Sequence, residues 1–220
     1  MKNSLEGCLL PEDRLYSLPN DLWFKPLTRP STYVVGVVTP FLHFAGRPRR
    51  ISVKPVGSLL RKNTSLALYI SLRMEGALTA PVDCRVLRTN DEVANPEVVA
   101  EDPYERGWLA ELECLEQPSL AGFREALDYY SRVNADRGVV CFDVVPHHEL
   151  KVFGETCEGI LTQMGDFMEL NVKTGDTLHV ITADPATEVD MISWAEKTGH
   201  VLLGLKRTGR TLHALYRKMK

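Results

Sequence analysis

The 220-residue sequence predicts an α+β protein of two domains, a β-rich domain over residues 1–137 and a two-layer α/β sandwich over residues 138–220. Short β-branched and apolar runs alternate with prolines over the first hundred residues, which predicts strands and leaves no room for a long helix. One amphipathic helix closes this part. The last part predicts the order β-α-β-α-β-β, which is typical of a two-layer sandwich.

Composition excludes several classes of function. Hydrophobic residues make up 44% and charged residues 25%, as in an ordinary soluble globular protein. A net charge of -3 and a pI near 6.1 give no electrostatic reason to expect nucleic acid or an acidic membrane as partner. The first residues are polar, and no apolar run approaches the roughly 18 residues that span a bilayer. We therefore expect no signal peptide, no membrane segment and a cytoplasmic location.

The five cysteines are scattered and odd in number. No pair has the C-x-x-C spacing, so the sequence predicts neither a metal site nor a disulfide framework. This usage fits the reducing cytosol. Cys114 and Cys141 stand in strand-like runs, where packing is the expected role.

The elements of the first domain follow from local pattern. A helix is predicted from the spacing of Leu120, Phe123, Ala126, Leu127, Tyr130 and Val133, with a stop at residues 134–138. The segment from Arg73 to Pro81 contains Gly76 and suits the end of a hairpin. Strands are predicted at residues 32–38, 51–53, 65–72, 82–87 and 108–112.

Five segments of this half resemble the glycine cleavage system H protein, a lipoyl-bearing β-sandwich shuttle. They are Pro11–Ser17, Val56-Gly57, Ala80-Pro81-Val82, Asn95-Pro96-Glu97 and Glu101–Trp108. The resemblance covers essentially the whole first half, and its Asp-Pro-Tyr-x-x-Gly-Trp match is specific. It implies an H-protein-like barrel-sandwich with a lipoyl-domain fold.

The same resemblance places Arg73 where that family carries its lipoyl lysine. A guanidinium is permanently protonated and cannot form the amide that tethers lipoate. Ser52-Val53-Lys54 resembles the attachment motif, but it lies one strand too early for a hairpin tip. We therefore expect a degenerate lipoyl domain without lipoate, which acts in partner docking.

The second domain is organised around a helix that begins at Cys157. Gly154 lets the preceding strand turn, and Thr156 is the predicted N-cap. The helix carries apolar residues at helical spacing, so one face packs on a sheet. A thiol at a helix N-terminus lies where the dipole favours an anion, and the thiolate is the reactive form. The alternative is that Cys157 is a small residue filling a turn. The apolar positions are Ile160, Leu161, Met164, Phe167, Met168 and Leu170.

Further elements complete the predicted sandwich. Asp184 supplies a cap oxygen and Pro185 a first helical residue for a second helix, which carries Val189, Ile192 and Trp194 or Ala195 on its apolar face. The remaining strands are predicted at residues 139–145, 150–152, 177–182, 201–205 and 211–217, with a hairpin turn at residues 207–210.

This part resembles the small TusA/SirA-like sulfur carriers, in which a cysteine carries a persulfide. The match rests on His148-x-Leu150, Gly154-x-x-Cys157, Lys173–Leu178, Ala183–Thr187 and the closing hairpin. By this resemblance Cys157 is the carrier. The chain shows Cys157-Glu158-Gly159-Ile160 where the family has Cys-Pro-x-Pro. Without the prolines the first turn loses stiffening, and the charge of Glu158 opposes a thiolate, although it also suits the helix dipole.

Two polar clusters have simpler interpretations. Adjacent histidines on a strand point to opposite faces, so His147 and His148 do not easily share a metal ion, and a surface or turn role is expected. The basic C-terminal hairpin predicts a solvated edge that discourages strand pairing, with a docking face for an acidic partner or RNA as the alternative. Its cations are Lys206, Arg207, Arg210, Arg217, Lys218 and Lys220.

The sequence thus predicts a cytoplasmic sulfur-relay protein, a carrier of the sulfurtransferase type, with persulfide on Cys157 and a docking domain that lacks lipoate. The alternative is a non-catalytic adaptor or regulatory protein of lipoate- or sulfur-linked metabolism, in which both carrier sites are degenerate. Either function implies protein partners. RNA binding by the second domain ranks last because no aromatic stacking pair is evident.

Overall fold

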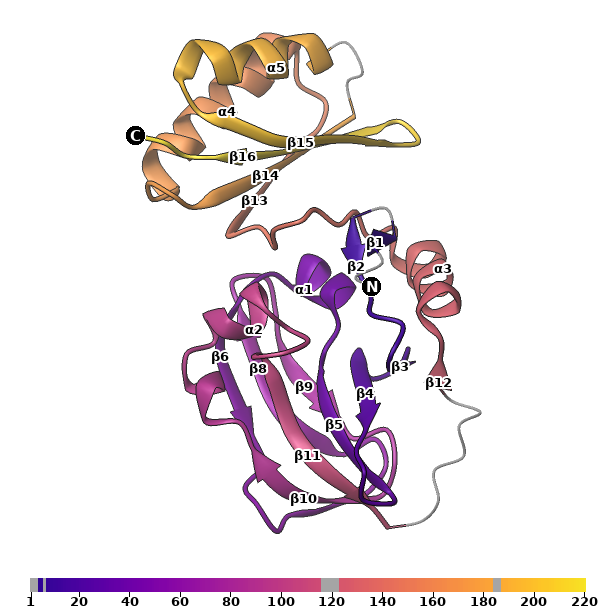
Figure 1. Cartoon of the computed structure of the whole chain (residues 1–220). Coiled ribbons are helices and arrows are strands. Elements are labelled where there is room, and N and C mark those ends of the chain that lie inside the picture. Colours follow the sequence, from indigo (N-terminus) through magenta and orange to yellow (C-terminus); the bar gives the residue numbers. More distant parts are fainter. Residues whose placement is uncertain (1–3, 6, 116–122, 184–186) are drawn as a thin grey trace. The chain divides into compact units, whose positions relative to one another are not determined.

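A computed structural model describes residues 4–5, 7–115, 123–183 and 187–220 as a mixed α+β protein (Figure 1). Its contacts divide the chain into two compact units, residues 1–145 and residues 146–220. The sequence places this division after residue 137, whereas the contacts place it after Val145. Each unit has its own hydrophobic core.

The N-terminal unit is built around a seven-stranded sheet of order β12-β3-β4-β5-β11-β10-β7 and a three-stranded sheet of order β6-β8-β9. Paired β1 and β2 precede them. The strands of the unit are β1 (Ser4–Leu5), β2 (Cys8–Leu9), β3 (Leu15–Ser17), β4 (Leu22–Pro26), β5 (Thr32–Val37), β6 (Pro48–Val53), β7 (Leu59–Leu60), β8 (Ser65–Ser71), β9 (Glu75–Thr79), β10 (Cys84–Thr89), β11 (Trp108–Cys114) and β12 (Phe123–Arg124).

Short helices connect these strands: α1 (Thr39–Ala45), the 3-10 helix η1 (Asp91–Ala94) and α2 (Glu97–Glu101), before α3 (Ala126–Arg137) closes the unit. The sequence does not predict α1, because Pro40 reads as a helix breaker. Proline is tolerated in the first turn of a helix, and that is its place in α1.

Two predictions in the N-terminal unit are wrong in part. The closing helix begins at Ala126, and Phe123 instead pairs with Ser17 of β3 as part of β12. The run 139–145 forms no strand, although Val139, Cys141, Phe142 and Val145 are all buried. An apolar run of this kind indicates that the segment is buried, but it does not distinguish a buried strand from buried irregular chain. Leu120 lies outside the described residues.

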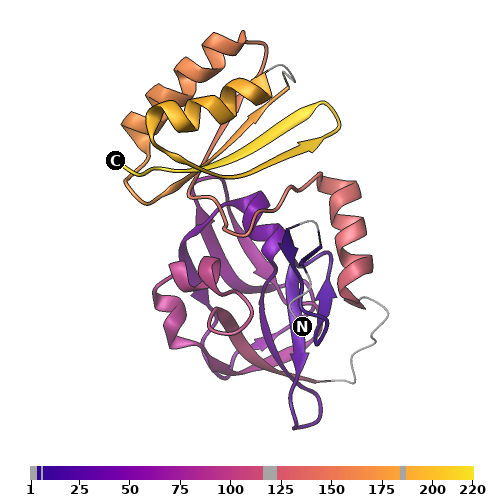
Figure 2. The same ribbon diagram turned by 45° about the horizontal axis from the view of Figure 1, so that its top comes forward.

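The C-terminal unit has the predicted order β-α-β-α-β-β. Its four-stranded sheet has the order β13-β14-β16-β15, with β13 parallel to β14 and the other pairs antiparallel. Both helices lie on one face of this sheet (Figure 2). The elements are β13 (His148–Val152), α4 (Cys157–Asn171), β14 (Thr177–Thr182), α5 (Thr187–Thr198), β15 (Val201–Thr208) and β16 (Thr211–Arg217).

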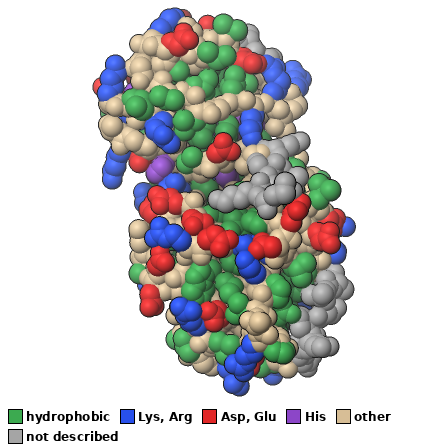
Figure 3. Space-filling model, viewed as in Figure 1, with side chains coloured by type: hydrophobic (Ala, Val, Ile, Leu, Met, Phe, Trp, Pro, Cys, Tyr) green, Lys and Arg blue, Asp and Glu red, His purple; other side chains and the backbone are tan. Residues whose placement is uncertain are grey.

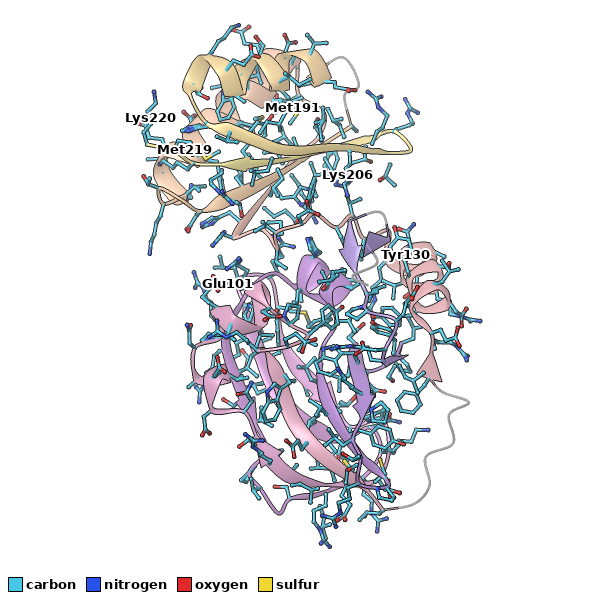
Figure 4. All side chains as sticks on the ribbon, viewed as in Figure 1. Glu101, Tyr130, Met191, Lys206, Met219 and Lys220 are labelled. Carbon is cyan, nitrogen blue, oxygen red and sulfur yellow. A yellow bond between two sulfur atoms is a disulfide. The ribbon has the colours of Figure 1, made fainter. Side chains whose placement is uncertain are left out.

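The helix faces that meet this sheet differ from the predicted ones in some positions. Ile160, Met164 and Met168 of α4 are buried, but Leu170 is 80% exposed. On α5 the buried face contains Met191, which lies between helix and sheet in Figure 4, whereas Val189 is 73% exposed. Ile192 is also exposed, so the predicted apolar face of α5 is wrong at two positions.

Acidic and basic side chains are interspersed on the face of the N-terminal unit that Figure 3 shows. Among the charged residues of this unit, Arg88 pairs with Glu111 at 3.1 Å and Arg106 pairs with Glu92 at 2.6 Å. In the described part of the chain, no helix is long and apolar enough to cross a membrane.

Candidate functional site

Cys157 is the first residue of α4, a helix of 15 residues. The Thr156 hydroxyl accepts a hydrogen bond from the Gly159 amide at 3.2 Å, which confirms the predicted N-cap. Gly154 has a φ of 77°, a left-handed conformation that glycine adopts without steric cost. The thiol is half-exposed, so a partner can reach it at the positive end of the helix.

Asp190 of α5 contacts this thiol. The Sγ atom of Cys157 donates a hydrogen bond to Oδ2 of Asp190 at 2.7 Å. A carboxylate at this distance favours the protonated sulfur, whereas the helix N-terminus favours the thiolate. The two effects on the charge of the sulfur oppose each other. The sequence pattern points to Glu158, which is adjacent to the cysteine, and not to Asp190, because 33 residues separate Asp190 from the cysteine.

The surroundings of the thiol combine acidic and apolar side chains. Glu155 and Glu158 are exposed at the beginning of α4. Phe153, in the loop before the helix, is 54% exposed. Gly159 belongs to the first turn of α4 and is half-buried. Asp184 and Pro185, the predicted start of the second helix, lie outside the described residues.

The other cysteines are poorly suited to sulfur chemistry. Burial raises the pKa of the Cys84 thiol to about 12 and that of Cys114 to about 11. Thiolates are the nucleophiles, so both residues are expected to be inert. Cys114 lies in β11 as predicted.

Cys8 and Cys141 form a disulfide, contrary to the prediction that the chain has none. Both residues are almost fully buried, and 133 positions separate them in the sequence. No spacing motif announces such a pair, because the fold alone brings β2 beside the segment that follows α3. Cys141 is therefore neither a strand residue nor a packing residue only.

Arg73 lies in the turn between β8 and β9, here called the hairpin tip and defined as residues 72–74. Its Nη1 atom donates to the carbonyl oxygens of His43 at 2.6 Å and Phe44 at 3.4 Å. These carbonyls belong to the C-terminal turn of α1, whose dipole favours a cation. Lys54, by contrast, is exposed after the end of β6.

The specific motifs of the N-terminal unit meet around Arg14, which is buried. Its guanidinium lies 4.6 Å from the centroid of the Trp23 ring and donates to the carbonyl oxygen of Tyr104 at 2.8 Å. The Tyr104 hydroxyl donates to the carbonyl oxygen of Leu9 at 2.6 Å, and burial raises its pKa to about 12. These contacts join the N-terminal strands to the Asp-Pro-Tyr segment and give the motif a structural role.

The two adjacent histidines share a partner, which strand geometry did not predict. Nε2 of His147 and Nε2 of His148 each lie 3.5 Å from an oxygen of Asp176. His147 precedes β13, so strand alternation does not govern it. Within the described residues, no group of three or more His, Cys, Asp or Glu side chains is arranged to hold a metal ion.

The basic residues of the closing hairpin make local contacts. Arg207 pairs with Glu188 of α5. Nζ of Lys218 donates to the carbonyl oxygens of Met168 at 2.8 Å and Val172 at 2.9 Å, so it caps the C-terminal end of α4. Met219 and Lys220 follow at the chain end (Figure 4).

Comparison with known proteins finds relatives of the N-terminal unit. The family model described as Glycine cleavage H-protein matches residues 14–135. Glycine cleavage system H protein 2 of Aquifex aeolicus is 32% identical over 108 residues, 49% of this chain and 66% of the relative. H protein 5 of the same organism is 28% identical over 146 residues, 62% of this chain and 97% of the relative.

A solved structure shows the same fold. The crystal structure of a glycine cleavage system H protein from Mycobacterium marinum covers 56% of this chain and 98% of its own, with a TM-score of 0.50 and 22% identity. The family match lies entirely within the N-terminal unit. It includes Arg73 and excludes Cys157.

Proposed function

The chain belongs to the glycine cleavage H-protein family, and from this premise we propose that it is a sulfur-relay protein with persulfide on Cys157. In this proposal the N-terminal unit docks protein partners, among which proteins of the glycine cleavage system are the first candidates. Arg73 takes the place of the lipoyl lysine, so the unit carries no lipoate.

The observation that carries the proposal is the position of Cys157. It is half-exposed at the start of a long helix, whereas Cys84 and Cys114 are buried. The TusA/SirA-like pattern of the C-terminal unit supports the same assignment, as does its β-α-β-α-β-β order.

The transfer of sulfur to Cys157 needs no added oxidant, because one sulfur–sulfur bond forms as another breaks. The Cys157 thiolate attacks the outer sulfur of a donor protein's persulfide, and the donor's sulfur–sulfur bond breaks. The donor sulfur leaves as a thiolate, and the new persulfide stays on Cys157. The carboxylate of Asp190 accepts a hydrogen bond from the thiol at 2.7 Å and favours the protonated sulfur, so the thiol loses its proton to solvent when docking separates it from this carboxylate.

Intact mass spectrometry after incubation with a cysteine desulfurase and cysteine tests the proposal. The expected result is a one-sulfur adduct that disappears in Cys157→Ala and persists in Cys114→Ala. An adduct that survives in Cys157→Ala, or the absence of any adduct, would contradict it. The same spectrum shows whether any lysine carries lipoate, which the proposal excludes.

The second candidate is an adaptor in which both carrier sites are degenerate. Two observations favour it: Arg73 donates to carbonyl groups of α1, and the Cys157 thiol donates to the carboxylate of Asp190, which favours the protonated sulfur. An adaptor binds its partners equally well with Cys157→Ala. A relay protein loses sulfur transfer in that variant while partner binding persists.

A further inference from the structure

We propose that helix α1 couples the hairpin tip to the segment of residues 139–145, from which the chain continues into the C-terminal unit. Both ends of this coupling lie within the N-terminal unit. The proposal does not depend on persulfide chemistry. It rests on the contacts at the two sides of His43.

On the first side, side chains of the β8–β9 hairpin donate hydrogen bonds to four consecutive carbonyl oxygens at the end of α1. Arg73 donates to the carbonyl oxygens of His43 and Phe44, and the Ser71 hydroxyl donates to the carbonyl oxygen of Ala45 at 2.6 Å. The Tyr69 hydroxyl donates to the carbonyl oxygen of Gly46. Helix C-termini leave such carbonyls without intrahelical partners, so the hairpin completes the end of α1.

The backbone of the hairpin tip is fixed by the same group. Ser71 Oγ accepts hydrogen bonds from the amides of Arg73 at 3.0 Å and Met74 at 3.1 Å. Gly46 has a φ of 85°, and a Cβ built there would lie 3.2 Å from Cδ of Arg73. The arginine stem therefore runs closely over the glycine, which makes the hairpin tip and α1 one packed body.

On the second side, the His43 ring holds the segment that follows α3. Its Nε2 atom accepts a hydrogen bond from the Phe142 amide at 3.0 Å. Nε2 is therefore unprotonated, and Nδ1 carries the proton that points to the Thr39 carbonyl oxygen at 3.1 Å. Thr39, His43 and Phe142 also line one pocket, so the contact between His43 and Phe142 forms part of its wall.

One residue of a short helix thus connects both segments. The His43 carbonyl binds Arg73, and the His43 ring binds Phe142. A helix of seven residues has little stability of its own, so its order depends on these outside contacts. Loss of the Arg73 contact is expected to loosen α1 and, through the ring of His43, the Phe142 amide. A protein that pulls on the hairpin tip would act on the same segment.

Hydrogen–deuterium exchange of the full chain tests the coupling. Arg73→Gln removes a charged donor, so exchange at the Gly46 and Phe142 amides is expected to rise at least about tenfold. Arg73→Lys keeps one charged donor and should give a smaller rise. Arg49→Gln, an exposed arginine of β6, is the matched control and should change neither amide.

Strand β11 reports global unfolding. A rise at Phe142 that exceeds the rise at the β11 amides supports the coupling. Unchanged exchange at Phe142, or an equal rise in β11, overturns it. In a His43→Leu background the ring contact is already lost, so Arg73→Lys should no longer affect Phe142, whereas an additive effect contradicts the proposed route. None of these outcomes bears on sulfur transfer by Cys157.

Discussion

Replacing Cys8 and Cys141 by alanine removes a covalent link between residues 133 positions apart. In the chain-entropy description, a disulfide that closes a loop of this length stabilises the folded state by about 5 kcal/mol. Native disulfides measured in small domains contribute about 2–5 kcal/mol, because strain and residual structure reduce the entropic value. We therefore expect the N-terminal unit to lose about 2–5 kcal/mol of unfolding free energy.

The assay is urea unfolding of the full chain followed by tryptophan fluorescence. Trp23 and Trp108 report on the N-terminal unit, and Trp194 lies in the core of the C-terminal unit. In a Trp194→Phe background the signal therefore follows the N-terminal unit alone. Oxidised protein should unfold at a higher urea concentration than the same protein treated with a dithiol reductant.

Two controls separate the cross-link from packing and from the reagent. The double alanine variant should not respond to the reductant. Cys114→Ala removes a buried thiol of another strand and should cost only its packing, typically less than the cross-link. If reduction shifts the unfolding free energy by less than about 1 kcal/mol, the disulfide does not constrain the unfolded chain and the reasoning is wrong.

Three further outcomes are expected. Asp190→Asn removes the carboxylate at the Cys157 thiol, so alkylation of this thiol at neutral pH should accelerate and its pH profile should move to lower pH. The control Glu158→Gln should have a smaller effect. Slower alkylation of Asp190→Asn would contradict the described contact. Lys218→Met removes the cap of α4 and should destabilise the C-terminal unit by about 1–3 kcal/mol in thermal unfolding. Lys173→Met is the exposed control. Equal thermal unfolding midpoints for the two variants would refute the capping role. Hydrogen bonding to Arg14 lowers the pKa of Asp13 to about 2, so the stability that this carboxylate contributes is present above the unfolded value near 3.8 and is lost as the pH falls through 2. Because the carboxyl is half-exposed, Asp13→Asn should lower the free energy of unfolding by less than about 1 kcal/mol at pH 6 and by much less at pH 2.

Local pattern predicted most elements, because each depends on residues close in sequence. The N-cap at Thr156 and the strands β5, β8 and β14 follow from neighbouring side chains alone. The resemblance to the H protein also follows from short contiguous motifs, and the family match over residues 14–135 includes all of them except residues 11–13. The run 139–145 shows the limit, since buried irregular chain and buried strand have the same composition.

Contacts between distant segments could not be predicted in this way. The disulfide, the Asp190 carboxylate at the thiol and the engagement of Arg73 with α1 each join residues that many positions separate. No local preference of Asp190 indicates that α5 will place it beside α4. Likewise, the sequence shows an arginine at position 73 but does not show where its guanidinium binds.

The sequence by itself determined the family of the N-terminal half, the presence of an arginine at position 73 and the order of strands and helices in the C-terminal unit. These properties are carried by side-chain chemistry and by periodicities of a few residues. The tertiary structure decided which groups surround Cys157, which cysteines join and what Arg73 holds. Packing brings such groups together only after the chain has folded, so their energies leave no mark on local sequence pattern.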